Sequence, residues 1–197
     1  MFRGTRGRPF RGRILQMSQA AFDDMLAEGR PRSLGRAKEV VGIVLSDPER
    51  LDELFECVFN DNELVRMRAG DALEKVCRQN PALLRPYIPR LLTEVSKIDQ
   101  PSVQWHLAQM LAEVGLNAKD RRAAIKVLTR NLISSKDWIV ITCTMESLAV
   151  FATTDTNLRM WLVDLLREYR LSSYKSISTK ARKLLAGLEK LKESSHR

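Results

Sequence analysis

Cysteine and histidine are the side chains of this chain best suited to bind metal ions or to act as nucleophiles. The three cysteines, Cys57, Cys77 and Cys143, are widely spaced, and none belongs to a Cys-x-x-Cys pair. The two histidines, His106 and His196, have no ligand spacing around them. Metal sites need several such donors at short intervals. We therefore expect no metal and no cofactor, and we interpret the cysteines as reduced thiols of a cytoplasmic protein.

Motifs for phosphate binding and for nucleophilic hydrolysis are missing as well. The chain has no Gly-x-x-x-x-Gly-Lys run, whose backbone N–H groups cradle nucleotide phosphates. It also has no Gly-x-Ser-x-Gly turn, which exposes the nucleophile of many hydrolases. No apolar run reaches about 18 residues, so we expect no membrane-spanning segment and no membrane partner. These absences predict a protein that is not an enzyme.

Basic side chains are concentrated at the two ends of the chain. The 197 residues include 33 Lys and Arg against 24 Asp and Glu, a net charge of +9. Residues 1–13 contribute +5, residues 47–80 contribute −4 and residues 167–197 contribute +6. The chain is 44% hydrophobic, which excludes a wholly disordered protein. The basic ends of the chain could therefore bind an acidic partner.

The first 13 residues form an arginine-glycine segment without any acid. Its arginines are Arg3, Arg6, Arg8, Arg11 and Arg13. Repeated glycine and mutual repulsion of the arginines oppose helix and sheet, so we interpret the segment as a flexible arm. Three interpretations stay open: a sequence-independent phosphate contact, an organellar targeting segment, or a solvated tail without a role.

Two further basic clusters follow helical spacing. Arg122, Lys126 and Arg130 recur every four residues and share one helix face, which we interpret as a solvated outer face. Lys175 and Lys180 belong to the basic C-terminal end. An acidic protein segment or a nucleic acid is the alternative partner for these clusters.

The chain beyond residue 13 is predicted to be helical throughout. Several helix starts are marked by a capping residue that precedes a first-turn proline. Others are marked by a capping residue that precedes an apolar pattern of helical period, and these caps are Asp61, Asn117, Ser135 and Asp155. Pro86 and Pro89 predict a bend in one helix. The expected helices are 14–28, 33–45, 48–59, 62–79, 81–97, 101–115, 118–133, 137–152, 156–170 and 174–191.

Every second helix repeats the same apolar pattern. Val65, Val103, Val140 and Ile177 are separated by 38, 37 and 37 residues, and three further columns keep these intervals. Each helix thus presents an apolar stripe that one helical hairpin cannot bury alone, so neighbouring hairpins must stack. We predict an all-α fold, an α-solenoid of about five antiparallel hairpins, with residues 14–192 as one domain and 193–197 as a polar tail.

One of these helices resembles a known family. The run Asp61 to Leu73, Asp-Asn-Glu-Leu-Val-Arg-Met-Arg-Ala-Gly-Asp-Ala-Leu, is similar to the inner helix of a HEAT repeat. Later copies replace the family's arginine by Gln104, Ile141 and Ser178, so the Asp and Arg ladder of HEAT stacks is mostly missing. The resemblance implies a right-handed HEAT-like or armadillo-type superhelix that acts as a binding scaffold.

Side chains opposite the apolar stripe are expected on the concave face of this stack. Trp105 is the aromatic residue of this face, and packing against an adjacent hairpin is its alternative role. Trp138 and Trp161 are predicted in the core or between hairpins. The expected partner-binding residues are Arg66, Met67, Asp71, Trp105, Gln109, Thr142, Met145, Glu146, Thr179, Arg182 and Lys183.

Three functions follow from these patterns. The first is a non-catalytic scaffold that binds a protein or peptide through the concave face. The second is nucleic-acid binding through the arginine-rich arm and the basic C-terminal end. The third is a DNA glycosylase, because glycosylases that excise alkylated bases resemble this architecture. However, Gln109 stands four residues after Trp105, where a catalytic Asp would be needed. Residues 47–80 are also acidic, which disfavours contact with a phosphate backbone. The pattern leaves the partner and the oligomeric state open.

Overall fold

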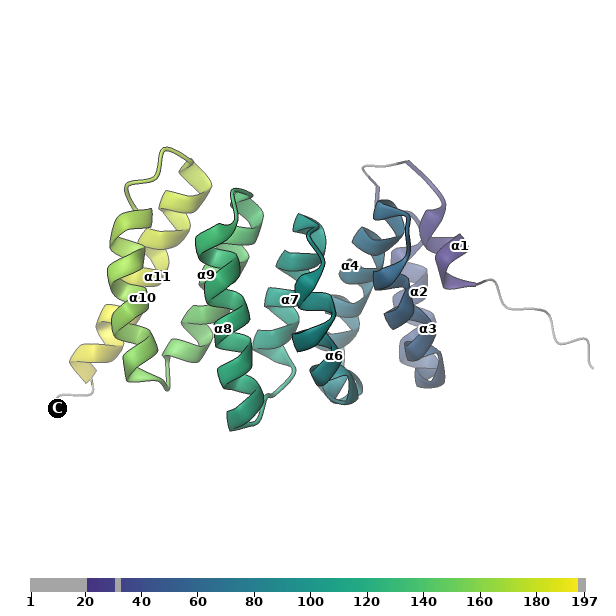
Figure 1. Cartoon of the computed structure of the whole chain (residues 1–197), viewed down its shortest axis with the longest axis horizontal. Helices are drawn as coiled ribbons and strands as arrows, with labels where there is room; N and C mark the ends of the chain where they lie inside the picture. Colours follow the sequence, from purple (N-terminus) through teal and green to yellow (C-terminus); the bar gives the residue numbers. More distant parts are fainter. Residues whose placement is uncertain (1–20, 31–32, 195–197) are drawn as a thin grey trace, which may run out of the picture.

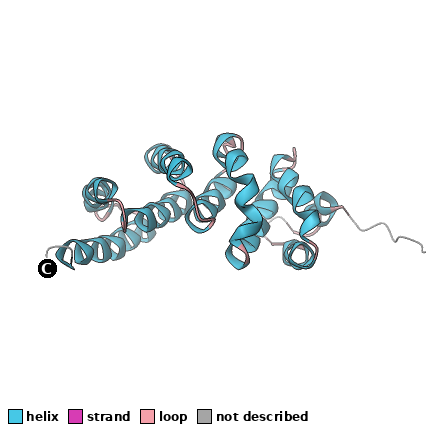
Figure 2. Ribbon diagram, turned by 90° about the horizontal axis from the view of Figure 1, so that it is seen from below, coloured by secondary structure: helices cyan, strands magenta, loops and turns pink. Residues whose placement is uncertain are grey.

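The computed structural model describes residues 21–30 and 33–194 of the chain, and 81% of these residues are helical, with no strand among them. Figure 1 shows the helices following one another along the long axis of the molecule, and Figure 2 shows the same all-helical array from below. The α-helices are α1 (Phe22–Ala27), α2 (Ala37–Ser46), α3 (Leu51–Glu56), α4 (Glu63–Gln79), α5 (Pro81–Leu84), α6 (Ile88–Thr93), α7 (Pro101–Glu113), α8 (Ala118–Ser134), α9 (Trp138–Ala152), α10 (Thr156–Tyr169) and α11 (Lys175–Ser194).

Side-chain caps fix where several of these helices begin. Asn117 and Asp155 cap α8 and α10 as expected, because their side-chain oxygens accept hydrogen bonds from N–H groups of the first turn. The other two expected caps, Asp61 and Ser135, are wrong by one and two residues. Asn62 caps α4 and Asp137 caps α9. Ser135 instead accepts a bond from the N–H of Asp137 and shapes the preceding turn.

Proline breaks the predicted helix over residues 81–97, as expected. The segment divides into α5, the 3₁₀ turn η3 (Arg85–Tyr87), α6 and the 3₁₀ turn η4 (Val95–Lys97). Pro86 and Pro89 lack the N–H groups that a continuous helix would use there. The predicted helix over 48–59 is also divided, into η1 (Pro48–Arg50), α3 and η2 (Cys57–Phe59).

Helix contacts run in sequence from one end of the molecule to the other. α4 packs on α2 and on α7, α7 packs on α9, and α9 packs on α11. The helices between them pack beside this row, with α8 and α10 both against α9. Figure 1 shows the same succession, from purple α1 to yellow α11. Each helix of the row therefore has a neighbour on two flanks, except at the ends.

The repeated apolar columns form the core of this row. All their members are buried, at most 7% exposed, so every position of the predicted columns lies in the interior of the packed helices. Val41 and Val44 of α2 are buried in the same way. The columns consist of Val65, Val103, Val140 and Ile177; Ala69, Leu107, Thr144 and Ala181; Leu73, Leu111, Leu148 and Leu185; and Val76, Val114, Phe151 and Leu188.

A candidate binding face on the central helices

Contacts on both flanks of α7 determine which of its residues remain open. On one flank, Gly70 of α4 lies so close that a Cβ there would be 3.4 Å from Cδ2 of His106. On the other flank, the hydroxyl of Ser147 in α9 donates a hydrogen bond of 2.7 Å to the carbonyl oxygen of Ala108. The apolar stripe points to the core, so the helix surface that remains between the two flanks carries Trp105 and Gln109.

Trp105 occupies this remaining surface and is half-buried. Its ring centroid lies 5.5 Å from that of His106, at an interplanar angle of 58°. A half-buried indole keeps part of its ring available for contact while its position is fixed by neighbouring side chains. The structure shows Trp105 beside the imidazole of His106. Its role as a contact residue for a partner stays a prediction.

Charged side chains connect α4 to α7 beside Trp105. Lys75 pairs with Asp71 at 2.6 Å, and Arg78 pairs with the buried Glu74. Arg78 also lies 3.6 Å from a carboxylate oxygen of Glu113 in α7. Burial raises the pKa of the Glu74 carboxyl, and the nearby carboxylates of Glu113 and Asp71 raise it further. This α4–α7 cluster therefore contains three carboxylates, from Asp71, Glu74 and Glu113, and only two cations, from Lys75 and Arg78.

Three buried polar atoms of α7 form no well-aligned hydrogen bond: Nδ1 of His106, Oε1 of Gln109 and Oε2 of Glu113. The side chain of Gln109 still interacts with His106 and raises the pKa of its imidazole. His106 is 9% exposed, and burial lowers its pKa to about 4, so the imidazole is neutral at pH 7. Within the described residues, the other such atoms are Nδ2 of Asn131 and Oγ1 of Thr144. Buried polar atoms without a well-aligned hydrogen bond are uncommon, and three of them occur on one helix here.

The predicted residues of α4 lie beside this group. Met67 is half-buried, and Asp71 is buried with its carboxylate paired to Lys75. Arg66 is turned toward the end of the helix, where it donates hydrogen bonds of 2.7 Å to Oε1 of Gln100 and to the carbonyl oxygen of Asn60. The guanidinium of Arg66 thus joins two interhelical turns.

The predicted residues of α9 divide between surface and core. Glu146 is exposed and pairs with Lys180 of α11. Thr142 is buried, and its hydroxyl donates to the carbonyl oxygen of Trp138. Met145 is completely buried, so its assignment to the concave surface is wrong. Its helical position lies on the flank of α9 that faces α11, and that flank is covered.

The predicted residues of α11 are exposed at the end of the row. Thr179, Arg182, Lys183 and Lys175 are all accessible, and Arg182 donates a hydrogen bond to the carbonyl oxygen of Ser178. Lys180 is the one of these basic residues that reaches back to α9. The arm residues Arg3, Arg6, Arg8, Arg11 and Arg13 lie outside the described residues.

The other two tryptophans differ in burial, and the cysteines are free thiols. Trp161 packs against the core, as expected, whereas Trp138 is 46% exposed and its predicted burial is wrong. Trp138 is the first residue of α9, beyond the part of the helix that its neighbours cover. The three cysteines are free; Cys57 and Cys77 are buried, and burial raises the pKa of each of these two thiols to about 12.

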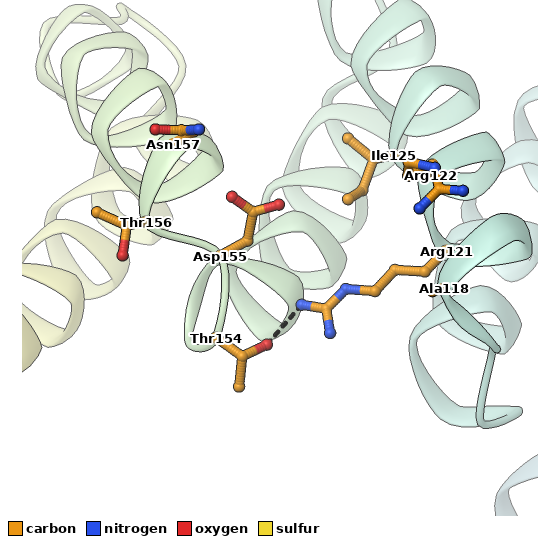
Figure 3. Close-up of a pocket in the computed structure, with 8 residues that line it drawn as sticks. All are labelled: Ala118, Arg121, Arg122, Ile125, Thr154, Asp155, Thr156 and Asn157. Carbon is orange, nitrogen blue, oxygen red and sulfur yellow. Dashed lines mark hydrogen bonds between the residues drawn. The ribbon is translucent and has the colours of Figure 1, made fainter.

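A cleft of about 440 Å³ between the first turns of α8 and α10 was not expected from the sequence (Figure 3). Arg121 donates hydrogen bonds to Oγ1 of Thr154 and to the carbonyl oxygen of Phe151. The recurrence of capping residues at Asn117 and Asp155 was the available signal, because it places the starts of two helices in corresponding positions of the repeat.

The described residues contain no group of three or more His, Cys, Asp or Glu side chains that could hold a metal ion. None of the helices described is long and apolar enough to cross a membrane. Comparison of the chain with protein-family models, with curated proteins and with solved structures gave no match.

Proposed function

We propose that this protein is a non-catalytic, HEAT-like right-handed α-solenoid that binds a protein or peptide through the face formed by α4, α7, α9 and α11. The ordered succession of helix contacts and the burial of all four repeated columns support this architecture. Such a stack buries its stripes between neighbours and leaves one surface of each inner helix for a ligand. The helix surface around Trp105 is the part of this face with the most distinctive chemistry.

One observation carries the proposal: α7 combines a half-buried tryptophan with a buried polar atom that lacks a partner. Trp105 supplies aromatic area, and Glu113, two helical turns later, carries a buried acceptor oxygen without a hydrogen-bond partner. Gln109 lies between them and interacts with the imidazole of His106. Binding sites commonly place an aromatic anchor beside a few polar groups that fix orientation. A small rotation of the Glu113 side chain would bring this oxygen to a ligand.

Charge on the α4–α7 part of this face favours a partner with a positive side chain, whereas the exposed Arg182 and Lys183 make the α11 end basic. The cations Lys75, Arg78 and Lys180 are already paired with carboxylates of the same face. A phosphate backbone would have to displace these internal pairs, so the face is poorly suited to nucleic acid. The α4–α7 cluster has one carboxylate more than it has cations, and a Lys or Arg from a partner would balance it. Such a cation next to an indole gains further attraction from the ring.

Selection from a random peptide display library on the full chain tests this proposal. We expect enriched peptides that contain Lys or Arg, and a synthetic copy should bind at least about 10-fold more weakly to Trp105→Ala and Gln109→Ala. Trp138→Ala is the matched control, because it removes an exposed tryptophan outside the face. Equal binding by wild type and Trp105→Ala, with both folded by circular dichroism, would overturn the proposal.

A salt series with duplex and single-stranded nucleic acid tests the alternative function. Binding through the basic ends should weaken steeply as salt rises and should be lost when Arg3, Arg6, Arg8, Arg11 and Arg13 are replaced by Gln. If that binding is tight while no peptide is enriched, the nucleic-acid function replaces the scaffold function. Nucleic-acid binding that depends on Trp105 would contradict the assignment of the face to a peptide.

A further inference from the structure

Large apolar side chains project from two successive interhelical turns at one edge of the molecule. Ile133 is 65% exposed and Leu171 is 79% exposed, whereas the other isoleucines that the structure describes are buried or half-buried, and most of the described leucines are buried. The aromatic residues Trp138 and Tyr174 are 46% and 61% exposed. Such clusters of exposed apolar side chains on a folded protein usually mark a contact surface. We call these four residues the apolar edge.

The fold places these residues together. α8 ends at Ser134 just before α9 begins, and α10 ends at Tyr169 just before α11 begins. Both connections lie at the upper edge in Figure 1. The hydroxyl of Tyr169 donates a hydrogen bond of 2.9 Å to the carbonyl oxygen of Leu132, so the ends of α8 and α10 are joined directly. The two turns therefore project on the same side of the array.

The two turns share a sequence pattern, an aliphatic residue followed by two serines, and each contains a serine turn, formed by a different serine of the pair. One reads Ile-Ser-Ser-Lys-Asp-Trp over residues 133–138, and the other reads Leu-Ser-Ser-Tyr-Lys over residues 171–175. In the first, the Ser135 hydroxyl accepts a hydrogen bond from the N–H two residues later, at 3.1 Å. In the second, Ser172 does the same, at 3.2 Å. These serine turns hold each aliphatic and aromatic pair in a defined, exposed position.

Exposed basic side chains border the apolar edge, together with one exposed acid, Glu168, near Leu171. Lys136, Arg170 and Lys175 are exposed in or next to the two turns. The one carboxylate within the first turn, Asp137, accepts hydrogen bonds from the N–H groups of Ile139 and Val140, so it is engaged as a helix cap. Aliphatic tips with Trp and Tyr, bordered by Lys and Arg, match the composition that proteins place at membrane–water interfaces.

We propose that the apolar edge binds the surface of an anionic lipid bilayer. Ile133, Trp138, Leu171 and Tyr174 enter the headgroup region, while the neighbouring cations contact acidic headgroups. The four side chains project outward from the turns, so they can insert into a soft bilayer surface. This proposal replaces the sequence-based expectation of no membrane partner; it requires no spanning helix and is independent of the peptide-binding face.

Co-sedimentation of the full chain with vesicles tests the proposal. Vesicles of phosphatidylcholine alone should bind weakly, and vesicles with about one third phosphatidylserine should bind at least about 10-fold better. Trp138→Ser and Leu171→Ser should each lower partition into the anionic vesicles about 10-fold, since each removes apolar area that enters the bilayer. Brominated lipids should quench wild-type fluorescence more strongly than that of Trp138→Phe.

Matched variants separate the apolar edge from other causes of vesicle binding. Met160→Ser removes a side chain that is 62% exposed near the opposite end of α10, and it should bind like wild type. Binding that is unchanged in Trp138→Ser and Leu171→Ser would show that the arginine-rich arm alone carries it, and this would overturn the proposal. So would edge-dependent binding to polyglutamate without binding to anionic vesicles, which would identify an acidic protein as the partner.

Discussion

Gly35 and Arg68 lie so close together that a Cβ at Gly35 would be 2.9 Å from the guanidinium carbon of Arg68. The same Cβ would be 2.5 Å from the carbonyl oxygen of Glu28. Gly35 also has a φ of +50°, which side-chain-bearing residues seldom adopt. Arg68 is fully buried in α4 and donates hydrogen bonds to the carbonyl oxygens of Leu26, Glu28, Arg30 and Ser33. One buried arginine thus attaches the α1–α2 connection to the rest of the molecule.

Gly35→Ala should lower the free energy of unfolding by about 2–4 kcal/mol, because it combines an unfavourable φ with two close contacts. Urea denaturation measures this change. Gly42→Ala is the matched control: Gly42 is in the interior of α2, and a Cβ there would have no neighbour within 4 Å. That control should raise stability by about 0.5–1 kcal/mol. Similar losses in both variants would contradict the special role of Gly35.

Arg68→Lys should destabilise the protein although it keeps the positive charge. The four carbonyl oxygens are served by three nitrogens of a planar guanidinium, and a single ammonium cannot reach them all. Leaving buried carbonyl groups without donors costs about 1–3 kcal/mol. Arg122→Lys is the control, because Arg122 is exposed on α8 and does not serve such a set of buried carbonyl oxygens. Hydrogen exchange should show the loss of protection first in α1 and α2.

Leu111→Ala should lower the free energy of unfolding by about 2–5 kcal/mol, since Leu111 is completely buried in the central helix of the row. Val150→Ala is its control, because Val150 is 52% exposed at the end of α9 and should change stability by about 0.5 kcal/mol or less. Equal effects would mean that the repeated columns do not form the core. Thermal and urea unfolding of both variants provide the measurement.

The sequence was sufficient to predict helices and the repeated core because both depend on local periodicity. Burial every third or fourth residue is visible along one helix, and an interval of 37 residues relates one helix to the next. The binding face was harder to predict because it depends on which flanks of a helix are covered. Met145 and Trp138 were misassigned for this reason: α11 covers the first, and the second lies at a helix start.

The α4–α7 cluster of charges could not be predicted because it depends on distances between helices. Arg78 and Glu113 are 35 positions apart, and no spacing within one helix indicates that their side chains meet. The neutral state of His106 likewise results from burial between two helices. The position of Trp105 and Gln109 on one side of α7 could be predicted, because it follows from helical periodicity alone.

Stability should fall as the pH drops from 6.5 to 4 because His106 resists protonation in the folded state. Its pKa is about 4 in the fold and about 6.5 for a solvated histidine, so the unfolded chain binds a proton first as the pH falls. The stabilisation is complete above pH 6.5 and is lost toward pH 4. A difference of this size amounts to about 3 kcal/mol. Burial is the main cause; Asp71 and the side chain of Gln109 raise the pKa, and Lys75 and Arg78 lower it.

His106→Gln should remove this loss, and His196→Gln, at the other histidine of the chain, should retain it. Glu74 acts in the opposite direction: its raised pKa makes the folded state take up a proton first, so it stabilises the fold as the pH falls. The difference between wild type and His106→Gln therefore isolates the histidine. Urea denaturation at half-unit steps from pH 7 to pH 4 measures it, and parallel curves for the two proteins would contradict a buried, neutral His106.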